Sequence, residues 1–320
     1  MIRIGVVGAG VIAAEHFKHI HANERAELVA ICDIVPNLAE TAANQYGATA
    51  YTQVSSMLER ENLDALFVCV PPFAHDDIEE QAARKGIHLL VEKPLGLDMA
   101  EVRRKAAIIS EAGILTSTGY CLRYMEPVQR AKQYLAGKEI GMVRAHRFGG
   151  LPPSAWWINH AKSGGQLVEQ TTHNVDLMVY LAGGVRKVYA DMALLLNSDV
   201  PGITTPDAAS VNLVFTSGAL GHIDTGFLPQ PDDRSSFEIM GRDFRLTIDG
   251  MKLTITEPGR STTWQGTGNF YKQQDDAFIR AIETGDNSLI LAPYEEVMRT
   301  LEVTLAANES AETGLPVMII

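Results

Sequence analysis

The chain has 320 residues, more than one hydrophobic core usually supports, so we expect two domains. Hydrophobic residues make up 46% of the sequence and charged residues 21%, a balance typical of globular rather than disordered proteins. The formal net charge is -12, and such a field repels nucleic acid backbones and anionic lipid headgroups. We therefore predict neither a nucleic acid nor a membrane partner.

The cysteines and the first residues indicate the cellular setting. Cys32, Cys69 and Cys121 lie in apolar stretches without the paired spacings of a zinc site or a disulfide framework, so we predict no metal site. Residues 1–12 carry one arginine followed by glycines, which is not the pattern of a signal peptide. No apolar run reaches the length that spans a bilayer. We expect a reduced, cytoplasmic setting.

Residues 2–119 alternate short apolar runs with amphipathic stretches. The apolar runs predict strands at residues 2–8, 27–33, 65–70, 88–93 and 114–119, and the clearest helical patterns cover 36–46 and 76–85. Near-continuous apolar strands joined by helices indicate a parallel sheet with helices on both faces. We predict a doubly wound α/β domain over residues 1–119.

From residue 120 onward, strand-like runs are joined by short glycine turns instead of helices. These runs cover residues 144–150, 187–196, 208–228, 235–250 and 252–258. The turns favour hairpins and an open, largely antiparallel sheet. Helical patterns at 127–135, 166–181, 271–283 and 293–312 interrupt the strands, so we predict an α+β domain over residues 120–320.

A glycine-rich motif follows the first predicted strand. Gly8, Gly10 and Ala13 match the G-x-G-x-x-G/A arrangement at the start of a helix. Gly8 permits a tight turn, Gly10 lets a pyrophosphate approach the backbone, and Ala13 allows close packing of helix on strand. The helix N-terminus offers free amides to the phosphates. We therefore predict a dinucleotide site that includes Gly8, Gly10, Val11 and Ile12.

Asp33 ends the second predicted strand, where a bound ribose would lie. A carboxylate at this position accepts hydrogen bonds from the adenosine ribose hydroxyls and repels a 2′-phosphate. We predict NAD as the cofactor, with NADP less favoured. The alternative role of Asp33 is to cap the turn into the next helix.

The loop after residue 70 is the next candidate for cofactor binding. We expect the strand to end at Val70, and Pro71 and Pro72 then stiffen a loop at the carboxyl edge of the sheet. These three residues are predicted to lie on the nicotinamide side of the site. His75 is a further cofactor contact, or else an exposed histidine at a helix start.

Glu92 and Lys93 follow the strand at 88–93 and reach the same sheet edge, where open α/β folds bind their ligands. A lysine close to the nicotinamide can hydrogen-bond the reacting oxygen and stabilise a developing alkoxide. We predict that Glu92 and Lys93 both border the cofactor, and that Lys93 also binds substrate and takes part in catalysis. The alternative is a surface lysine paired with Glu92.

Glu169, His173 and Asp176 are spaced by four and three residues, so on a single helix they share one face. A histidine can exchange the hydroxyl proton while hydride moves to or from the nicotinamide. A neighbouring carboxylate would orient the ring and favour its protonated form. We predict a catalytic group at these positions; the alternative is an amphipathic helix with a structural histidine.

Together, several blocks resemble one known family: GAGVIA, VEKPL, YCLRYMEPVQRAKQYLAGKEIGMV and GG-Q-L-x-E-Q-x-x-H-x-x-D. They are similar, in order and spacing, to the glucose–fructose oxidoreductase, inositol dehydrogenase and rhizopine catabolism proteins, the Gfo/Idh/MocA family. The resemblance covers essentially the whole chain. It implies an N-terminal Rossmann domain and a C-terminal domain that binds substrate. The open sheet of the C-terminal domain is expected to form a homo-oligomer, either a dimer or a tetramer.

The resemblance also implies residue roles. The family's catalytic lysine and histidine correspond to Lys93 and His173. The position four before the histidine is often aspartate in the family, whereas Glu169 keeps the charge on a longer side chain. Asp176 matches the family's other acidic position. We expect Glu169 to bind substrate or tune the histidine.

Five further residues are candidates for the substrate pocket. Tyr120 and Arg123 lie in a block that borders the cleft in relatives, and Tyr271 resembles a family position near the substrate. The rings of Trp156 and Trp157 suit the apolar side of a sugar. The alternatives are core or interface anchors for the tryptophans and a surface location for Tyr271.

These observations predict an NAD-dependent oxidoreductase that acts on the carbinol carbon of a sugar, cyclitol or related polyol. The hypothesis requires Lys93 and His173 to flank the same nicotinamide ring. One alternative is a lyase or glycoside hydrolase that oxidises its substrate transiently, with no net change in NAD. Another is a dinucleotide-sensing protein without catalytic activity.

Overall fold

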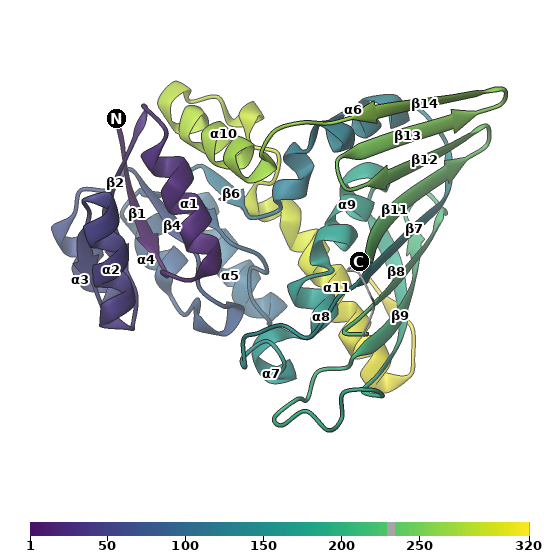
Figure 1. Cartoon of the computed structure of the whole chain (residues 1–320), viewed down its shortest axis with the longest axis horizontal. Coiled ribbons are helices and arrows are strands. Elements are labelled where there is room, and N and C mark those ends of the chain that lie inside the picture. Colours follow the sequence, from purple (N-terminus) through teal and green to yellow (C-terminus); the bar gives the residue numbers. More distant parts are fainter. Residues whose placement is uncertain (229–233, 320) are drawn as a thin grey trace. The chain divides into compact units, whose positions relative to one another are not determined.

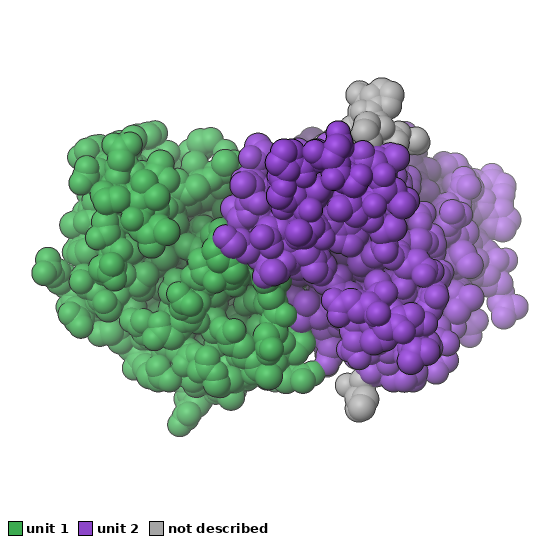
Figure 2. Space-filling view, turned by 90° about the horizontal axis from the view of Figure 1, so that it is seen from below, with its two compact units in different colours: residues 1–124, 269–298 green, residues 125–268, 299–320 purple. Residues whose placement is uncertain are grey.

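A computed structural model describes residues 1–228 and 234–319 and divides into two compact units, each discontinuous in sequence. Unit 1 comprises Met1–Tyr124 and Asn269–Met298, and unit 2 comprises Met125–Gly268 and Arg299–Ile320 (Figure 2). Ile320, the predicted end of the second domain, lies outside the described residues. The predicted division after residue 119 differs from these units, because it assigns residues 269–298 to the second domain.

Unit 1 contains a sheet of six strands, all within fully described ranges, in the order β3-β2-β1-β4-β5-β6 (Figure 1). Every neighbouring pair is parallel. The strand order reverses between β1 and β4, the point at which doubly wound sheets bind their ligands. Its elements in chain order are β1 (Ile2–Val7), α1 (Val11–His21), β2 (Ala26–Cys32), α2 (Pro36–Tyr46), β3 (Thr49–Tyr51), α3 (Val54–Arg60), β4 (Ala65–Val68), η1 (Pro72–Ala74), α4 (Ile78–Arg84), β5 (His88–Val91), α5 (Met99–Ala112), β6 (Thr116–Thr118), η2 (Cys121–Tyr124), α10 (Phe270–Thr284) and η3 (Asn287–Leu289).

The core of unit 1 is completed by a helix from far along the sequence. Ile4 of β1, Ile20 of α1 and Phe67 of β4 share one buried apolar cluster with Phe278 and Ile279 of α10. The Phe67 and Phe278 rings pack edge to face at 5.8 Å. Burial of such side chains stabilises the fold by about 1.5–3 kcal/mol each, so α10 is an integral part of this unit.

Unit 2 is built on a sheet with nine strands in its described part, in the order β14-β13-β12-β11-β7-β10-β9-β8-β15. The β7 and β10 strands are parallel, and the other neighbours are antiparallel. Its elements are α6 (Glu126–Leu135), β7 (Ile140–Phe148), α7 (His160–Ser163), α8 (Gln166–Glu169), α9 (Thr172–Ala182), β8 (Val185–Ala193), β9 (Ala208–Phe215), β10 (Leu220–Gly226), β11 (Arg234–Gly241), β12 (Phe244–Asp249), β13 (Lys252–Glu257), β14 (Arg260–Gln265) and β15 (Val317–Met318), with α11 (Tyr294–Thr313) beginning in unit 1 and continuing into unit 2.

The helices of unit 2 pack on one face of this sheet. The α6 helix contacts β12 and β13, α8 contacts β10, and α9 contacts β7. Figure 1 shows no helix of the described residues on the opposite face. None of the described helices combines the length and the apolar character that a bilayer crossing needs. The predicted fold class, a parallel doubly wound sheet followed by a largely antiparallel α+β part, is confirmed.

Two details of the prediction are wrong. The β4 strand ends at Val68 instead of Val70. The single helix predicted over 166–181 is two helices, α8 and α9. Gln166 carbonyl oxygen accepts from the amides of both Gln170 and Thr171, and the Thr171 hydroxyl bonds the Thr225 hydroxyl on β10. These contacts widen the turn and draw it to the sheet, so the helix restarts at Thr172.

Candidate active site

The predicted cofactor residues of unit 1 follow the carboxyl ends of parallel strands. Gly8 follows β1, Asp33 follows β2, and Glu92 and Lys93 follow β5. Since β2, β1, β4 and β5 are consecutive and parallel, these residues lie along one edge of the sheet. This is the edge at which doubly wound folds bind nucleotides.

The glycine loop has the geometry that a dinucleotide requires. Gly8 has φ +96°, and a Cβ there would lie 2.4 Å from the Cys69 carbonyl oxygen, so only glycine fits. A Cβ on Gly10 would meet nothing within 4 Å, and Val11 is 92% exposed. The N-terminus of α1 has neither a side-chain cap nor an acidic residue in its first turn. Its open amides fit the pyrophosphate of NAD.

Asp33 is tied to the glycine loop by hydrogen bonds. One carboxylate oxygen accepts from the Ala9 amide and the other from the Val35 amide, both at 2.8 Å. Each oxygen keeps acceptor capacity for a ribose hydroxyl. The neighbouring Ile34 and Val35 are exposed and carry no positive charge that would hold a 2′-phosphate. The residues at this end of the sheet therefore fit NAD better than NADP.

The loop after β4 contains a buried ionic group. His75 is 1% exposed, so the predicted alternative of an exposed histidine is wrong. Its Nδ1 lies 2.7 Å from Glu79, and Glu79 also pairs with the buried Lys105 at 3.1 Å. Burial alone would raise the pKa of Glu79, but His75 and Lys105 outweigh it and hold that pKa below its ordinary value. Cofactor contacts of Val70, Pro71, Pro72 and His75 stay predictions.

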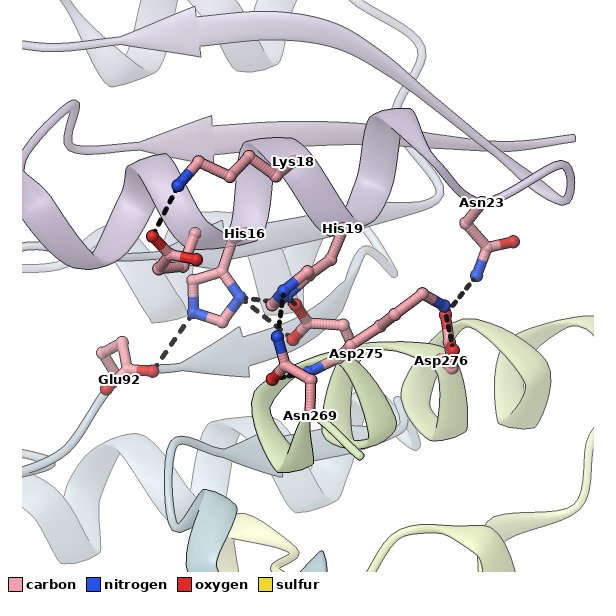
Figure 3. A network of polar contacts seen from close by, with 10 residues as sticks. His16, Lys18, His19, Asn23, Glu92, Asn269, Asp275 and Asp276 are labelled. Carbon is pink, nitrogen blue, oxygen red and sulfur yellow. Dashed lines mark hydrogen bonds and ion pairs between the residues drawn. The ribbon is translucent and has the colours of Figure 1, made fainter. Parts of the chain in front are cut away.

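Glu92 is 5% exposed and is held by protein groups. Its Oε1 lies 3.2 Å from Nε2 of His16 on α1, and its Oε2 accepts from the Lys93 amide at 3.3 Å. His16 in turn bonds Asp275 of α10 (Figure 3). Sequence reasoning missed His16 and Asp275. The available signal was a histidine on the face of α1 that also buries Ala13 and Ile20.

Three predicted substrate residues belong to unit 1. Tyr120 and Arg123 have no exposed surface, and Nη1 of Arg123 donates to the Leu291 carbonyl and to Glu296, each at 2.6 Å. Arg123 therefore joins η2 to the segment before α11, through Leu291, and to the first turn of α11, through Glu296. Tyr271, at the start of α10, shares a hydrogen bond with the Cys121 thiol, and burial raises the pKa of its phenol. Contact of these residues with substrate stays a prediction.

The remaining predicted residues lie in unit 2. Glu169 is buried at the end of α8, and His173 is half-buried in the first turn of α9. Asp176 accepts a hydrogen bond from the Thr300 hydroxyl at 2.9 Å, which ties α9 to α11. The rings of Trp156 and Trp157 stack at 5.7 Å in the preceding loop. The joint action of His173 and Lys93 stays a prediction.

The strand order, the glycine loop and Asp33 define the class of this protein, one that binds a dinucleotide. Comparison with known proteins agrees with this class. Residues 2–120 match the family described as "Oxidoreductase family, NAD-binding Rossmann fold", and residues 128–247 match the "GFO/IDH/MocA C-terminal domain".

Relatives match over most of the chain. The inositol 2-dehydrogenase of Rhizobium meliloti is 30% identical and covers 79% of this chain and 74% of that protein. The myo-inositol 2-dehydrogenase of Thermotoga maritima is 26% identical, over 97% of this chain and 96% of that protein. The WlbA dehydrogenase from Bordetella pertussis, solved in complex with NADH and UDP-GlcNAcA, has a TM-score of 0.87 at 27% identity and covers 100% and 99%.

The chain belongs to the Gfo/Idh/MocA family of oxidoreductases. It is an NAD-dependent dehydrogenase, and the predicted family, enzyme class and cofactor are confirmed. A small molecule is accordingly its substrate.

Proposed function

We propose that this enzyme transfers hydride between NAD and a carbinol carbon of a cyclitol or sugar, with Lys93 and His173 acting on the same hydroxyl group. The observation that carries the proposal is the position of Lys93. It follows β5 at the carboxyl edge of the sheet, the same edge at which the Gly8 loop follows β1. The inositol dehydrogenases among the relatives support a cyclitol as substrate.

Each residue has a separate task in this proposal. When bound, NAD supplies the acceptor for the hydride of the carbinol carbon. The Lys93 ammonium donates a hydrogen bond to the reacting oxygen and stabilises the negative charge that develops there. His173 accepts the hydroxyl proton. Glu169, four residues earlier, contributes a carboxylate that binds a substrate hydroxyl or orients the imidazole.

A substrate screen tests the proposal directly. NAD is incubated with myo-inositol, scyllo-inositol, glucose, xylose and their sugar acids, and NADH is followed by its absorbance. We expect accumulation with at least one cyclitol or sugar. Lys93→Ala and His173→Ala should each lower kcat by about 100-fold or more while NAD binding is retained.

Matched controls use the same residue types at the opposite end of the sheet. Lys85 lies just before β5 and His21 ends α1, and both are exposed. Lys85→Ala and His21→Ala should keep full turnover. Unchanged kcat in Lys93→Ala or His173→Ala would refute their catalytic roles, and a screen without NADH formation would refute net oxidation.

A second reaction class is supported by one relative. The 2,7-anhydro-N-acetylneuraminate hydratase of Mediterraneibacter gnavus is 27% identical over 186 residues. The same residues would serve a reaction in which the carbinol is oxidised only transiently. Product formed from an anhydro sugar without NADH accumulation would favour this reaction over net dehydrogenation.

We also propose that the enzyme is a homo-oligomer, a dimer or tetramer, formed through the sheet face of unit 2 that carries no helix in the described part. Support comes from exposed apolar side chains on β7 and β10: Met142 is 38% exposed and Leu220 is 51% exposed. Sedimentation of the wild type and of Met142→Glu tests this proposal. A wild-type monomer at micromolar concentration would contradict it.

A further inference from the structure

A buried polar network joins three elements of unit 1 that are far apart in sequence. Nδ1 of His16 lies 2.9 Å from both carboxylate oxygens of Asp275, and its Nε2 lies 3.2 Å from Oε1 of Glu92 (Figure 3). His19, one turn along α1, bonds the same Asp275 at 2.8 Å. The network thus connects the helix after the glycine loop, the end of β5 and the start of α10.

The side chains of this network are withdrawn from water. His16 is 1% exposed, Asp275 has no exposed surface, Glu92 is 5% exposed and His19 is 6% exposed. Among the described residues no group of histidine, cysteine and acidic side chains is arranged to hold a metal ion. A lone buried carboxylate is costly, and in this network the carboxylates of Asp275 and Glu92 lie against histidine nitrogens.

The geometry defines the charge state of His16. Both ring nitrogens face carboxylates, which only accept hydrogen bonds, and imidazolium is the one form of histidine with two N–H donors. Burial by itself would lower the pKa of His16, but Asp275 and Glu92 outweigh it and raise that pKa to about 10. His16 therefore carries a positive charge at neutral pH, between Asp275 and Glu92.

Glu92 is restrained on its other sides as well. Its Oε2 accepts from the amide of Lys93. A Cβ on Gly119, the residue after β6, would lie 2.4–2.5 Å from the three carboxyl atoms of Glu92. The carboxylate therefore packs directly against the Gly119 backbone, next to the point where the chain leaves β5.

Several other buried groups lie close to the two carboxylates. Cys121 and Tyr271 both interact with Glu92, and burial raises the pKa of each. The Phe67 ring on β4 packs edge to face against His16 at 5.3 Å. His19 bonds Asn269 at the N-cap of α10 through its second ring nitrogen. His16 is therefore the central bridge between Glu92 and Asp275.

We propose that His16 is a positioning residue for Lys93, acting through Glu92, whose carboxylate it holds against Gly119 and against the Lys93 amide. The inference rests on the proposed function, since it concerns the lysine assigned to the reacting oxygen. Displacement of a catalytic group by about 1 Å can lower turnover by as much as 100-fold, so loss of this contact should reduce kcat.

Two substitutions separate positioning from general stabilisation. In His16→Gln the side-chain amide replaces Nε2 and can still donate to Glu92, whereas in His16→Asn it replaces Nδ1 and reaches only Asp275. Both variants lose the cation and one of the two contacts. We expect His16→Asn to lower kcat about 10- to 100-fold, and His16→Gln to stay within about 3-fold of wild type. His21→Asn, an exposed position on the same helix, should match wild type.

The kinetics use NAD with myo-inositol, or with the polyol that the screen identifies. NAD affinity should remain within about 2-fold in all variants. An equal loss of kcat in His16→Asn and His16→Gln, or no loss in either, would overturn the proposal.

An NMR measurement distinguishes failure of this inference from failure of the proposed function. The backbone amide resonance of Lys93 should move in His16→Asn and stay near its wild-type position in His16→Gln, whether or not any polyol is turned over. Nitrogen shifts of the His16 ring should show both nitrogens protonated at about pH 8. A Lys93 amide that does not move in either variant, or a neutral His16 ring, would overturn the positioning role even if the dehydrogenase activity is confirmed.

Discussion

The carboxyl edge of the parallel sheet differs between its two halves. At the ends of β1 and β2, a Cβ on Gly10 would meet nothing within 4 Å, and Val11 and Ile34 are 92% and 87% exposed. At the ends of β5 and β6, a Cβ on Gly119 would lie 2.4 Å from the Glu92 carboxylate. One half leaves room for a ligand, and the other is filled by the protein's own charged groups.

The carboxylates Asp33 and Glu92 show the same contrast. Asp33 is half-buried and accepts hydrogen bonds from the Ala9 and Val35 amides, and its oxygens remain able to accept from a ribose. Glu92 is buried and faces the His16 cation. Two acidic residues that each follow a strand of one sheet therefore lie in different environments, and we expect Asp33 to serve the ligand and Glu92 to serve the lysine beside it.

The pH dependence of stability should give the largest effect. The folded pKa of His16 is raised to about 10, so its stabilising contribution is fully present below its unfolded pKa and is lost as pH rises through about 10. Between the unfolded pKa of about 6.5 and the folded pKa of about 10, the unfolding free energy of wild type should fall with pH more steeply than that of His16→Asn. The difference in slope should be about 1.4 kcal/mol per pH unit. Urea unfolding followed by circular dichroism measures both slopes. Parallel slopes would mean that His16 is not the cation of the filled half.

Gly119→Ala should be the next largest effect. The added methyl group must displace a carboxylate that His16 holds in place, and overpacking of this kind costs about 1–3 kcal/mol. In a His16→Asn background Glu92 is less restrained, so the same substitution should cost less. A double-mutant cycle on unfolding free energies tests this coupling. Additive costs would show that His16 does not hold Glu92 against Gly119.

Removing each of the two carboxylates in turn should give smaller effects, on NAD binding for Asp33 and on turnover for Glu92. Asp33→Ala should weaken NAD binding by about 10-fold and narrow the preference over NADP, because ribose acceptors are lost. Glu92→Gln should leave NAD affinity within about 2-fold and lower kcat instead. Titration of NAD and NADP by fluorescence and steady-state kinetics measure both. If Glu92→Gln weakened NAD binding as much as Asp33→Ala, the two halves would not differ in function.

Gly10→Ala should have the smallest effect on the protein itself. Its methyl group would project into open space, so stability should change by less than about 1 kcal/mol. NAD affinity should nevertheless fall several-fold, because the pyrophosphate approaches the backbone at this residue. Gly150→Ala, also without a neighbour within 4 Å, is the control and should leave both unchanged. Unaltered NAD binding in Gly10→Ala would place the pyrophosphate elsewhere.

The open half could be predicted from the sequence, whereas in the filled half the positions of Glu92 and Lys93 were predicted but the buried partners of Glu92 were not. The spacing of Gly8, Gly10 and Asp33 is a local pattern, because a tight turn, a helix and a strand fix it within one βαβ unit. By contrast, His16 and Asp275 are 259 residues apart, and no periodicity relates them. The environment of Glu92 depends on that distant contact, which is why its partner was missed.

The break between α8 and α9 illustrates the same limit. Glu169, His173 and Asp176 have helical spacing, but Thr171 bonds Thr225 on β10 and interrupts the helix. The two threonines are 54 residues apart, so the spacing of the helix residues gives no sign of this contact. Local chemistry identified the candidate residues, whereas tertiary contacts determine how they are presented.

The return of α10 to the first unit has a consequence for biosynthesis. As the ribosome releases the chain, residues 1–124 emerge long before Phe278, which completes the apolar cluster, and Asp275, which pairs with His16. One side of α1 therefore stays uncovered while residues 125–268 of unit 2 are translated. Chaperones that recognise exposed apolar surface would meet this intermediate first, and truncation before residue 269 should yield an insoluble product.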